Sequence, residues 1–66
     1  MYQFGERLVA DNHFNDHLVH EVPVQIYEGE KHKDIGFVQA YTRLFVRVND
    51  VLYNRTTCIF VSRPGY

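Results

Sequence analysis

Three histidines near the start of the chain have a spacing that can bind a metal ion. His13, His17 and His20 follow one another at intervals of four and three residues. In a helix these intervals place the three rings on one side, because successive residues turn by roughly 100°. Imidazoles arranged in this way can share a zinc or nickel ion. The alternatives are a patch that titrates near neutral pH and a solvent-facing polar stripe opposite Phe14 and Leu18.

A second set of residues has the composition of a binding surface. If aliphatic side chains fill the core between residues 35 and 63, alternation along the strands turns aromatic rings and arginines outward. The candidates are Phe37, Tyr41, Arg43, Phe45, Arg47, Arg55, Phe60 and Arg63. Such residues are enriched at protein interfaces, and rings beside arginines also bind single-stranded nucleic acid. A chain this short needs apolar area for its own core, so the alternative is that several rings are buried.

Charge is divided unequally between the two halves of the chain. Residues 1–34 contain three basic and seven acidic residues, a net charge of −4, whereas residues 35–66 contain four arginines and one aspartate, a net charge of +3. Either the two halves face each other, or the basic half presents a surface to an anionic partner. The overall charge of −1 falls short of the basic footprint of nucleic-acid-binding domains. We therefore expect a protein partner or a second copy of the chain ahead of nucleic acid.

The single cysteine, Cys58, limits the covalent and catalytic chemistry that the chain can perform. It excludes a disulfide or a cysteine metal cluster within the chain. Its position beside Ile59 in an apolar run favours a buried structural thiol over a nucleophile. The sequence contains no nucleophile–base signature or phosphate-binding loop, and a chain of 66 residues leaves little volume for an enclosed pocket. We expect neither enzymatic activity nor a cofactor.

Residues 1–21 are expected to form an N-terminal extension to a body of strands. Residues 1–10 show no clear periodicity and predict irregular structure or a short strand. Residues 11–21 favour a short helix that Asp11 or Asn12 would cap and Pro23 would end, and a loop is the alternative. Residues 22–27 alternate with period two, as in a half-buried strand. Residues 28–34 are charged and are expected to form a solvated loop.

The pattern after residue 34 predicts four further short strands. They are expected at residues 35–41, 44–48, 51–53 and 57–63. Asn49 and Asp50 predict a tight hairpin turn, because both residue types tolerate positive φ. Alternation assigns seven residues to the core, namely Val38, Ala40, Leu44, Val46, Val48, Ile59 and Val61.

Five short strands in one chain of this length predict a mainly β protein, a small five-stranded antiparallel barrel of the SH3-like type. Closing the barrel would hide the strand edges. We expect one domain over residues 1–66, with residues 22–63 contributing the strands. The sequence lacks the pattern of a signal peptide or a membrane span, so we expect a cytoplasmic protein with no membrane partner. These features favour a binding or assembly module. The alternatives are nucleic-acid binding and a metal- or pH-responsive histidine site.

Overall fold

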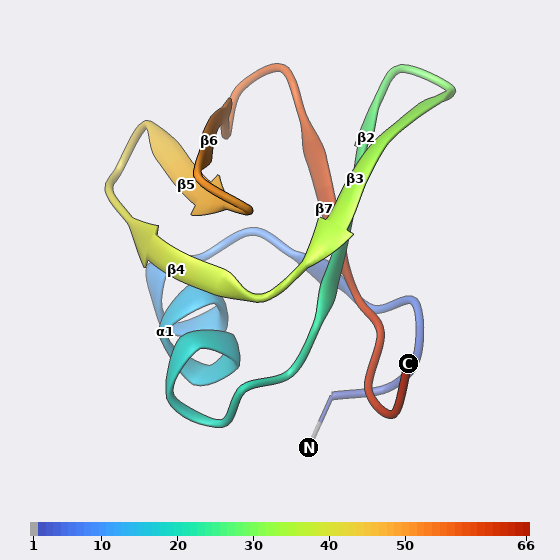
Figure 1. Ribbon diagram of the computed structural model, residues 1–66, viewed down its shortest axis with the longest axis vertical. Helices are drawn as coiled ribbons and strands as arrows, with labels where there is room; N and C mark the ends of the chain where they lie inside the picture. Colours follow the sequence, from blue (N-terminus) through green and yellow to red (C-terminus); the bar gives the residue numbers. More distant parts are fainter. Residues whose placement is uncertain (1) are drawn as a thin grey trace.

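Residues 2–66, which the computed structural model describes, form one helix and seven strands in two antiparallel sheets (Figure 1). In chain order these elements are β1 (Arg7–Leu8), α1 (Asp11–Val19), β2 (Val24–Glu28), β3 (Lys31–Gly36), β4 (Val38–Tyr41), β5 (Phe45–Val48), β6 (Val51–Asn54) and β7 (Ile59–Ser62). One sheet has the order β1-β7-β2-β3 and the other the order β4-β5-β6. The mainly β class is confirmed. The strands do not close into one barrel, so the expected SH3-like barrel is not confirmed.

Helix α1 lies where the sequence predicts a helix, but its first turn is capped differently. Ala10, not Asp11 or Asn12, occupies the N-cap position, and it has no side chain that can accept a hydrogen bond. Instead, Nδ1 of His13 accepts hydrogen bonds from the backbone N–H groups of Val9 and Ala10, each at 3.0 Å. The ring thus fills the role that Glu or Gln plays in a capping box.

The other end of α1 closes with a residue in the left-handed region. Glu21 has φ of 53°, and the N–H of Val22 donates to the carbonyl of His17 at 3.1 Å. This is the bond of a Schellman motif, in which a left-handed residue reverses the chain after the last helical turn. Pro23 follows directly and leads into β2.

The charged segment 28–34 is not the solvated loop that its composition suggested. Only Gly29 and Glu30 form a turn, and β3 begins at Lys31 and pairs with β2. Charges of opposite sign meet across this hairpin, with Lys33 Nζ 3.6 Å from a carboxylate oxygen of Glu28. Exposed strands can be charged along their whole length, so charge alone did not distinguish this edge strand from a loop.

The chain crosses from one sheet to the other at Phe37, between β3 and β4. The single strand expected over residues 35–41 is therefore bent into two. Gly36 permits the bend, because a Cβ atom there would lie 2.8 Å from the side chain of Asn49 and 3.0 Å from Val48. The absence of a side chain lets the β5–β6 hairpin pack directly against this point.

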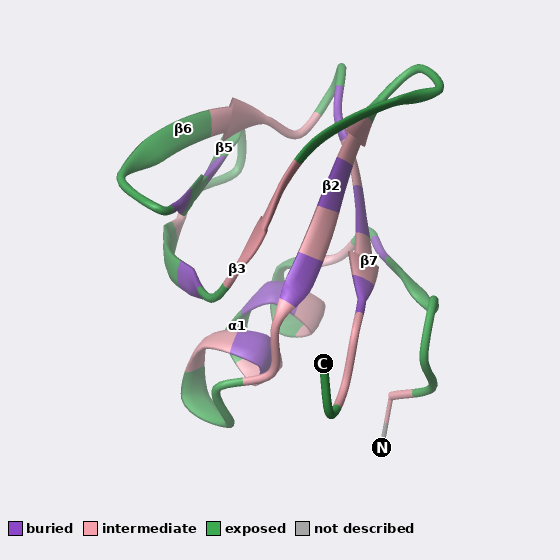
Figure 2. Ribbon diagram, turned by 45° about the vertical axis from the view of Figure 1, so that its right-hand side comes forward, coloured by how far each residue is buried: buried purple, intermediate pink, exposed green. Residues whose placement is uncertain are grey.

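The core lies between the two sheets and α1, as the buried positions in Figure 2 show. Its members are Leu8, Phe14, Val24, Ile26, Val38, Val46, Val48, Cys58 and Phe60. The prediction was right for Val38, Val46 and Val48 but wrong for Ala40 and Leu44, which are exposed.

The predicted orientation of β7 was also wrong. Ile59 and Val61 are only half-buried, whereas Phe60, expected outside, is 2% exposed. Phe60 lies opposite the buried Ile26, so both side chains face the core. Because side chains alternate along a strand, an assignment that is wrong by one residue turns every side chain to the other face.

Candidate binding surface

The three-stranded sheet presents apolar side chains to solvent on the side away from the core. Arg47 on β5 lies opposite Leu52 on β6, so these two side chains share a face. Phe45, two residues before Arg47 on the same strand, points to that face as well. Leu44 adjoins Phe45 at the start of β5. Leu44 and Leu52 are 60% and 63% exposed. We call Leu44, Phe45, Arg47 and Leu52 the outer sheet surface.

A tight hairpin turn holds the register of this surface. Asn49 and Asp50 have φ of 51° and 65°, as a type I′ turn requires, so the predicted hairpin is confirmed. Gln39 on β4 braces the turn: its side chain accepts from the N–H of Asp50 at 2.8 Å and donates to the carboxylate at 3.1 Å. Arg47 forms an exposed ion pair with Asp50 at 3.4 Å. Such an exposed pair contributes little stability and leaves Arg47 free to exchange partners.

Strand β6 ends the three-stranded sheet and has a free edge. In a two-residue hairpin the pair Val48–Val51 exchanges hydrogen bonds, and bonded pairs then alternate with unbonded ones. The N–H and C=O of Leu52 therefore point away from β5. Within residues 2–66 no other strand pairs with β6. Its four residues, Val51–Asn54, carry no charge, whereas charged side chains are a common protection of exposed edges.

A polar cluster fixes β6 against the other sheet. Tyr53 donates its hydroxyl to Asp34 at 2.7 Å, and the amide of Asn49 donates to the same carboxylate at 2.9 Å. Burial and the bond to Asp34 raise the pKa of Tyr53 to about 12. Burial would raise the pKa of Asp34, but the hydrogen bonds from Tyr53, the Ile35 N–H and Asn49 outweigh it and lower the pKa. The cluster places Leu52, the neighbour of Tyr53, on a rigid frame.

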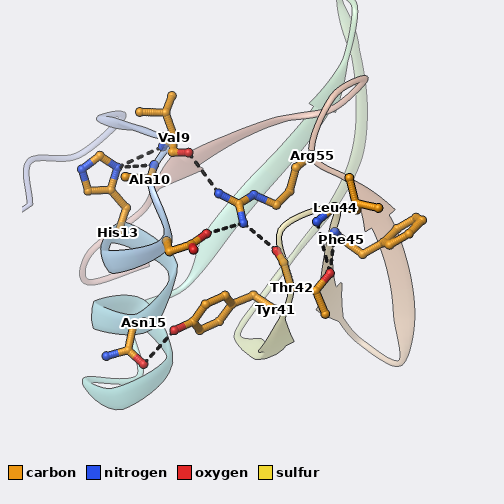
Figure 3. A network of polar contacts seen from close by, with 10 residues as sticks. Val9, Ala10, His13, Asn15, Tyr41, Thr42, Leu44, Phe45 and Arg55 are labelled. Carbon is orange, nitrogen blue, oxygen red and sulfur yellow. Dashed lines mark hydrogen bonds and ion pairs between the residues drawn. The ribbon is translucent and has the colours of Figure 1, made fainter.

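Arg55, a candidate for the binding surface, is committed to internal contacts (Figure 3). Its guanidinium pairs with Asp11 at 2.7 Å and donates to the carbonyls of Val9 and Thr42. It also lies over the ring of Phe14, 4.5 Å from the centroid, and its side chain is 13% exposed. Arg55 therefore ties the start of α1 to the β4–β5 turn.

Arg63 is likewise engaged, on the four-stranded sheet. It donates to Gln25 at 2.7 Å and to the hydroxyl of Tyr27 at 3.4 Å, and it lies 4.6 Å from the ring centroid of Phe4. Neither Arg55 nor Arg63 belongs to the outer sheet surface.

The remaining candidates divide between surface and interior. Arg43, Phe45 and Arg47 are exposed and follow one another along the β4–β5 turn and β5, and Phe37 is exposed at the bend between the sheets. Tyr41 is half-buried, packs against the core and donates its hydroxyl to Asn15 at 3.1 Å. Sequence reasoning missed two residues of this surface. Alternation assigned Leu44 to the core, and it gave Leu52 no role.

The three histidines do not form the shared site that their spacing suggested. His13 accepts the two capping bonds, and Nδ1 of His20 lies 3.0 Å from the carbonyl of Asp16. His17 is fully buried beside Phe14, not on a solvent-facing stripe. No group of three or more His, Cys, Asp or Glu side chains in the described part of the chain is placed to hold a metal ion.

His17 is a structural residue with both ring nitrogens occupied. Nδ1 lies 2.7 Å from the carbonyl of His13, which can only accept, so Nδ1 carries the proton. Nε2 lies 2.7 Å from Oγ of Ser62 and accepts its hydroxyl proton. Tyr2 packs edge-on against the imidazole, with centroids 4.3 Å apart. Burial lowers the pKa of His17, because the charged imidazolium would lose its hydration.

Comparisons with protein-family models, with curated proteins and with solved structures found no match. The structure itself adds one negative observation: no helix among residues 2–66 combines the length and the hydropathy that crossing a membrane requires.

Proposed function

We propose that this chain is a non-enzymatic assembly module that associates with a second copy of itself through β6 and the outer sheet surface. The observation that carries the proposal is the free, uncharged edge of β6 with the exposed Leu52 at its centre. Figure 2 shows this strand at the outside of the molecule, coloured as exposed over its first half. An unprotected edge is a template for another strand.

The geometry suits a twofold arrangement of two copies. Because the N–H and C=O of Leu52 point outward, two antiparallel β6 strands can exchange these groups directly and form one six-stranded sheet. The two Leu52 side chains then lie opposite each other and bury apolar surface that each copy exposes alone. No charged side chain of β6 opposes another in this pairing.

Strand β3, one of the two edges of the other sheet, offers a contrast that supports this choice. β3 carries Lys31, Lys33 and Asp34, and a β-bulge interrupts its pairing with β2. Charges and bulges both discourage a further strand from adding to an edge. The second copy is therefore expected at β6 and not at β3.

A mass measurement in solution tests the proposal. We expect light scattering after gel filtration to give a multiple of the 7.8 kDa chain mass, rising with concentration. Leu52→Lys should return the protein to the monomer, because the pairing would place two ammonium groups opposite each other. The matched control is Val19→Lys, since Val19 is 62% exposed on α1, away from β6. A protein that is monomeric at millimolar concentration would contradict the proposal and leave a different protein as the partner.

Nucleic-acid binding is the second candidate, and the exposed Phe45 with Arg43 and Arg47 favours it. Rings that stack on bases beside arginines that meet phosphates are the elements of single-strand binding. Only two of the four arginines remain free for this role, because Arg55 and Arg63 are engaged internally. Binding of a single-stranded oligonucleotide that weakens steeply with added salt, and that Arg47→Ala reduces, would support this candidate.

A further inference from the structure

A second candidate site is a cavity that shares no residue with the outer sheet surface. Its volume is about 610 Å³, and it lies between the segment after α1 and the residues that follow β7. Figure 1 shows these segments at the same end of the molecule, where the chain also reaches its C-terminus. The volume lies within the range of about 300–1,000 Å³ that small-molecule sites occupy.

The wall of the cavity is mainly apolar. Tyr2, Val22, Pro23 and Pro64 line it, and most of its surface is apolar, so a ligand with a hydrocarbon body would lose contact with water there. Tyr2 is held in place, because its hydroxyl donates to Asp16 at 2.8 Å and its ring packs on His17. Burial, together with the bond to Asp16, raises the pKa of Tyr2 to about 12, so the phenol remains neutral.

The charged groups at the cavity are carboxylates. Asp16 and Glu21 line it, and neither residue takes part in an ion pair in the part of the chain that the structure describes. Among residues 2–66 no lysine or arginine lines the cavity, and the other titratable side chains that do so are Tyr2 and His20. The cavity also adjoins the C-terminal end of α1, where the helix carries partial negative charge.

These features together select the chemistry of a ligand. Apolar walls select against a bare inorganic ion, and the carboxylates with the helix end select against an anion. Tyrosine and carboxylate groups are the surroundings in which organic cations bind. We propose that this cavity binds a small organic cation, an alkylammonium or guanidinium group carried on a short hydrocarbon chain. Such a group occurs both in free amines and in the side chains of lysine and arginine.

The proposal is tested by titrating the full chain with n-butylammonium while amide ¹H–¹⁵N shifts are followed. The titration is run at constant ionic strength and at pH 8, where imidazoles are ordinarily neutral. We expect saturable shifts at Val22 and Gly65, which line the cavity. n-Butanol, with the same hydrocarbon but no charge, should bind at least tenfold more weakly. Equal binding of butanol, or shifts that do not saturate, would overturn the proposal.

A pair of charge-neutralising variants tests where the cation binds. Glu21→Gln should weaken butylammonium binding about two- to fivefold, as expected for an ion pair that stays partly hydrated. Glu30→Gln removes the same charge from the exposed β2–β3 turn, outside the cavity, and should change nothing. Equal weakening in both variants would show only general attraction to an acidic protein and would overturn the assignment.

A third probe distinguishes the two sources of the cation. Nα-acetyl-lysine methylamide carries the same ammonium group on a side chain between two amides. Binding of this probe at an affinity similar to that of butylammonium identifies a lysine side chain of a peptide as an occupant. Binding of butylammonium alone identifies a free amine, and failure of both probes overturns the proposal. None of these results depends on whether the chain self-associates, because the cavity and the outer sheet surface share no residue.

Discussion

The helix side of this molecule buries its large side chains among partners from distant parts of the chain, whereas the outer sheet side leaves apolar side chains exposed. On the helix side, Phe14, His17 and Arg55 each contact residues from distant parts of the chain, and their apolar or polar groups are satisfied internally. On the outer sheet side, Leu44 and Leu52 lie at the start of β5 and on β6 and remain exposed. From this difference we expect that the exposed leucines contribute little to folding, since the core is formed by other residues.

Truncation of a core ring should give the largest effect and the clearest contrast between the two sides. Phe14→Ala removes a ring that packs edge-on against Phe60, with centroids 5.3 Å apart, and should cost about 3–5 kcal/mol of unfolding free energy. Leu52→Ala should change it by less than about 0.5 kcal/mol. Urea denaturation followed by circular dichroism, in dilute protein, measures both. A comparable loss in Leu52→Ala would show that the outer sheet surface belongs to the folding core.

Removal of the Arg55 contacts should have the next largest effect. Arg55→Ala removes the hydrogen bonds to the carbonyls of Val9 and Thr42 and the packing of the guanidinium on Phe14, and should cost about 2 kcal/mol, since Asp11 stays hydrated and contributes little of this. Arg43→Ala is the matched control on the exposed turn and should cost less than about 0.5 kcal/mol. The same urea titration reports both values, and equal losses would refute the structural role assigned to Arg55.

The smallest of these effects should be the contribution of His17 to the pH dependence of the unfolding free energy. Burial lowers its pKa in the folded protein below the unfolded value of about 6.5, so the folded state binds fewer protons. Stability is therefore unaffected by His17 well above pH 6.5 and decreases as the pH falls below that value, a change that a comparison of pH 7.5 with pH 5.5 spans. Urea midpoints at these two pH values measure it, and His17→Gln should make them more nearly equal. This window lies above the range in which Asp34, whose pKa is lowered, takes up its proton.

The sequence predicted those features that depend on neighbouring residues. The helix was visible from Phe14 and Leu18 on one face with Pro23 beyond the end, and the β5–β6 hairpin from the dipeptide Asn49–Asp50. Both are set by local backbone preferences, which act within a few residues. The alternating pattern of residues 22–27 likewise indicated β2 to within two residues.

The sequence did not predict those features that depend on distant partners. The run from Cys58 to Val61 is apolar on both faces of a strand, so alternation alone could not decide whether Phe60 or Ile59 points inward; pairing with Ile26 decides it. His17 is buried because Ser62, 45 residues later, satisfies its ring. No local pattern contains that information. Leu52 was overlooked for the same reason, because its exposure follows from the sheet order.

The contacts of Arg55 and His17 also have a consequence for the order in which the chain can fold. The β2–β3 and β5–β6 hairpins each join residues that are close in sequence, so their loops close at small entropic cost. Helix α1, which lies near the start of the chain, is tied to residues 44 and 45 positions later through Asp11 and His17. An isolated helix of nine residues is unstable in water. The helix is thus synthesised early but is among the last elements to be fixed, because its partners are complete only when Ser62 is in place.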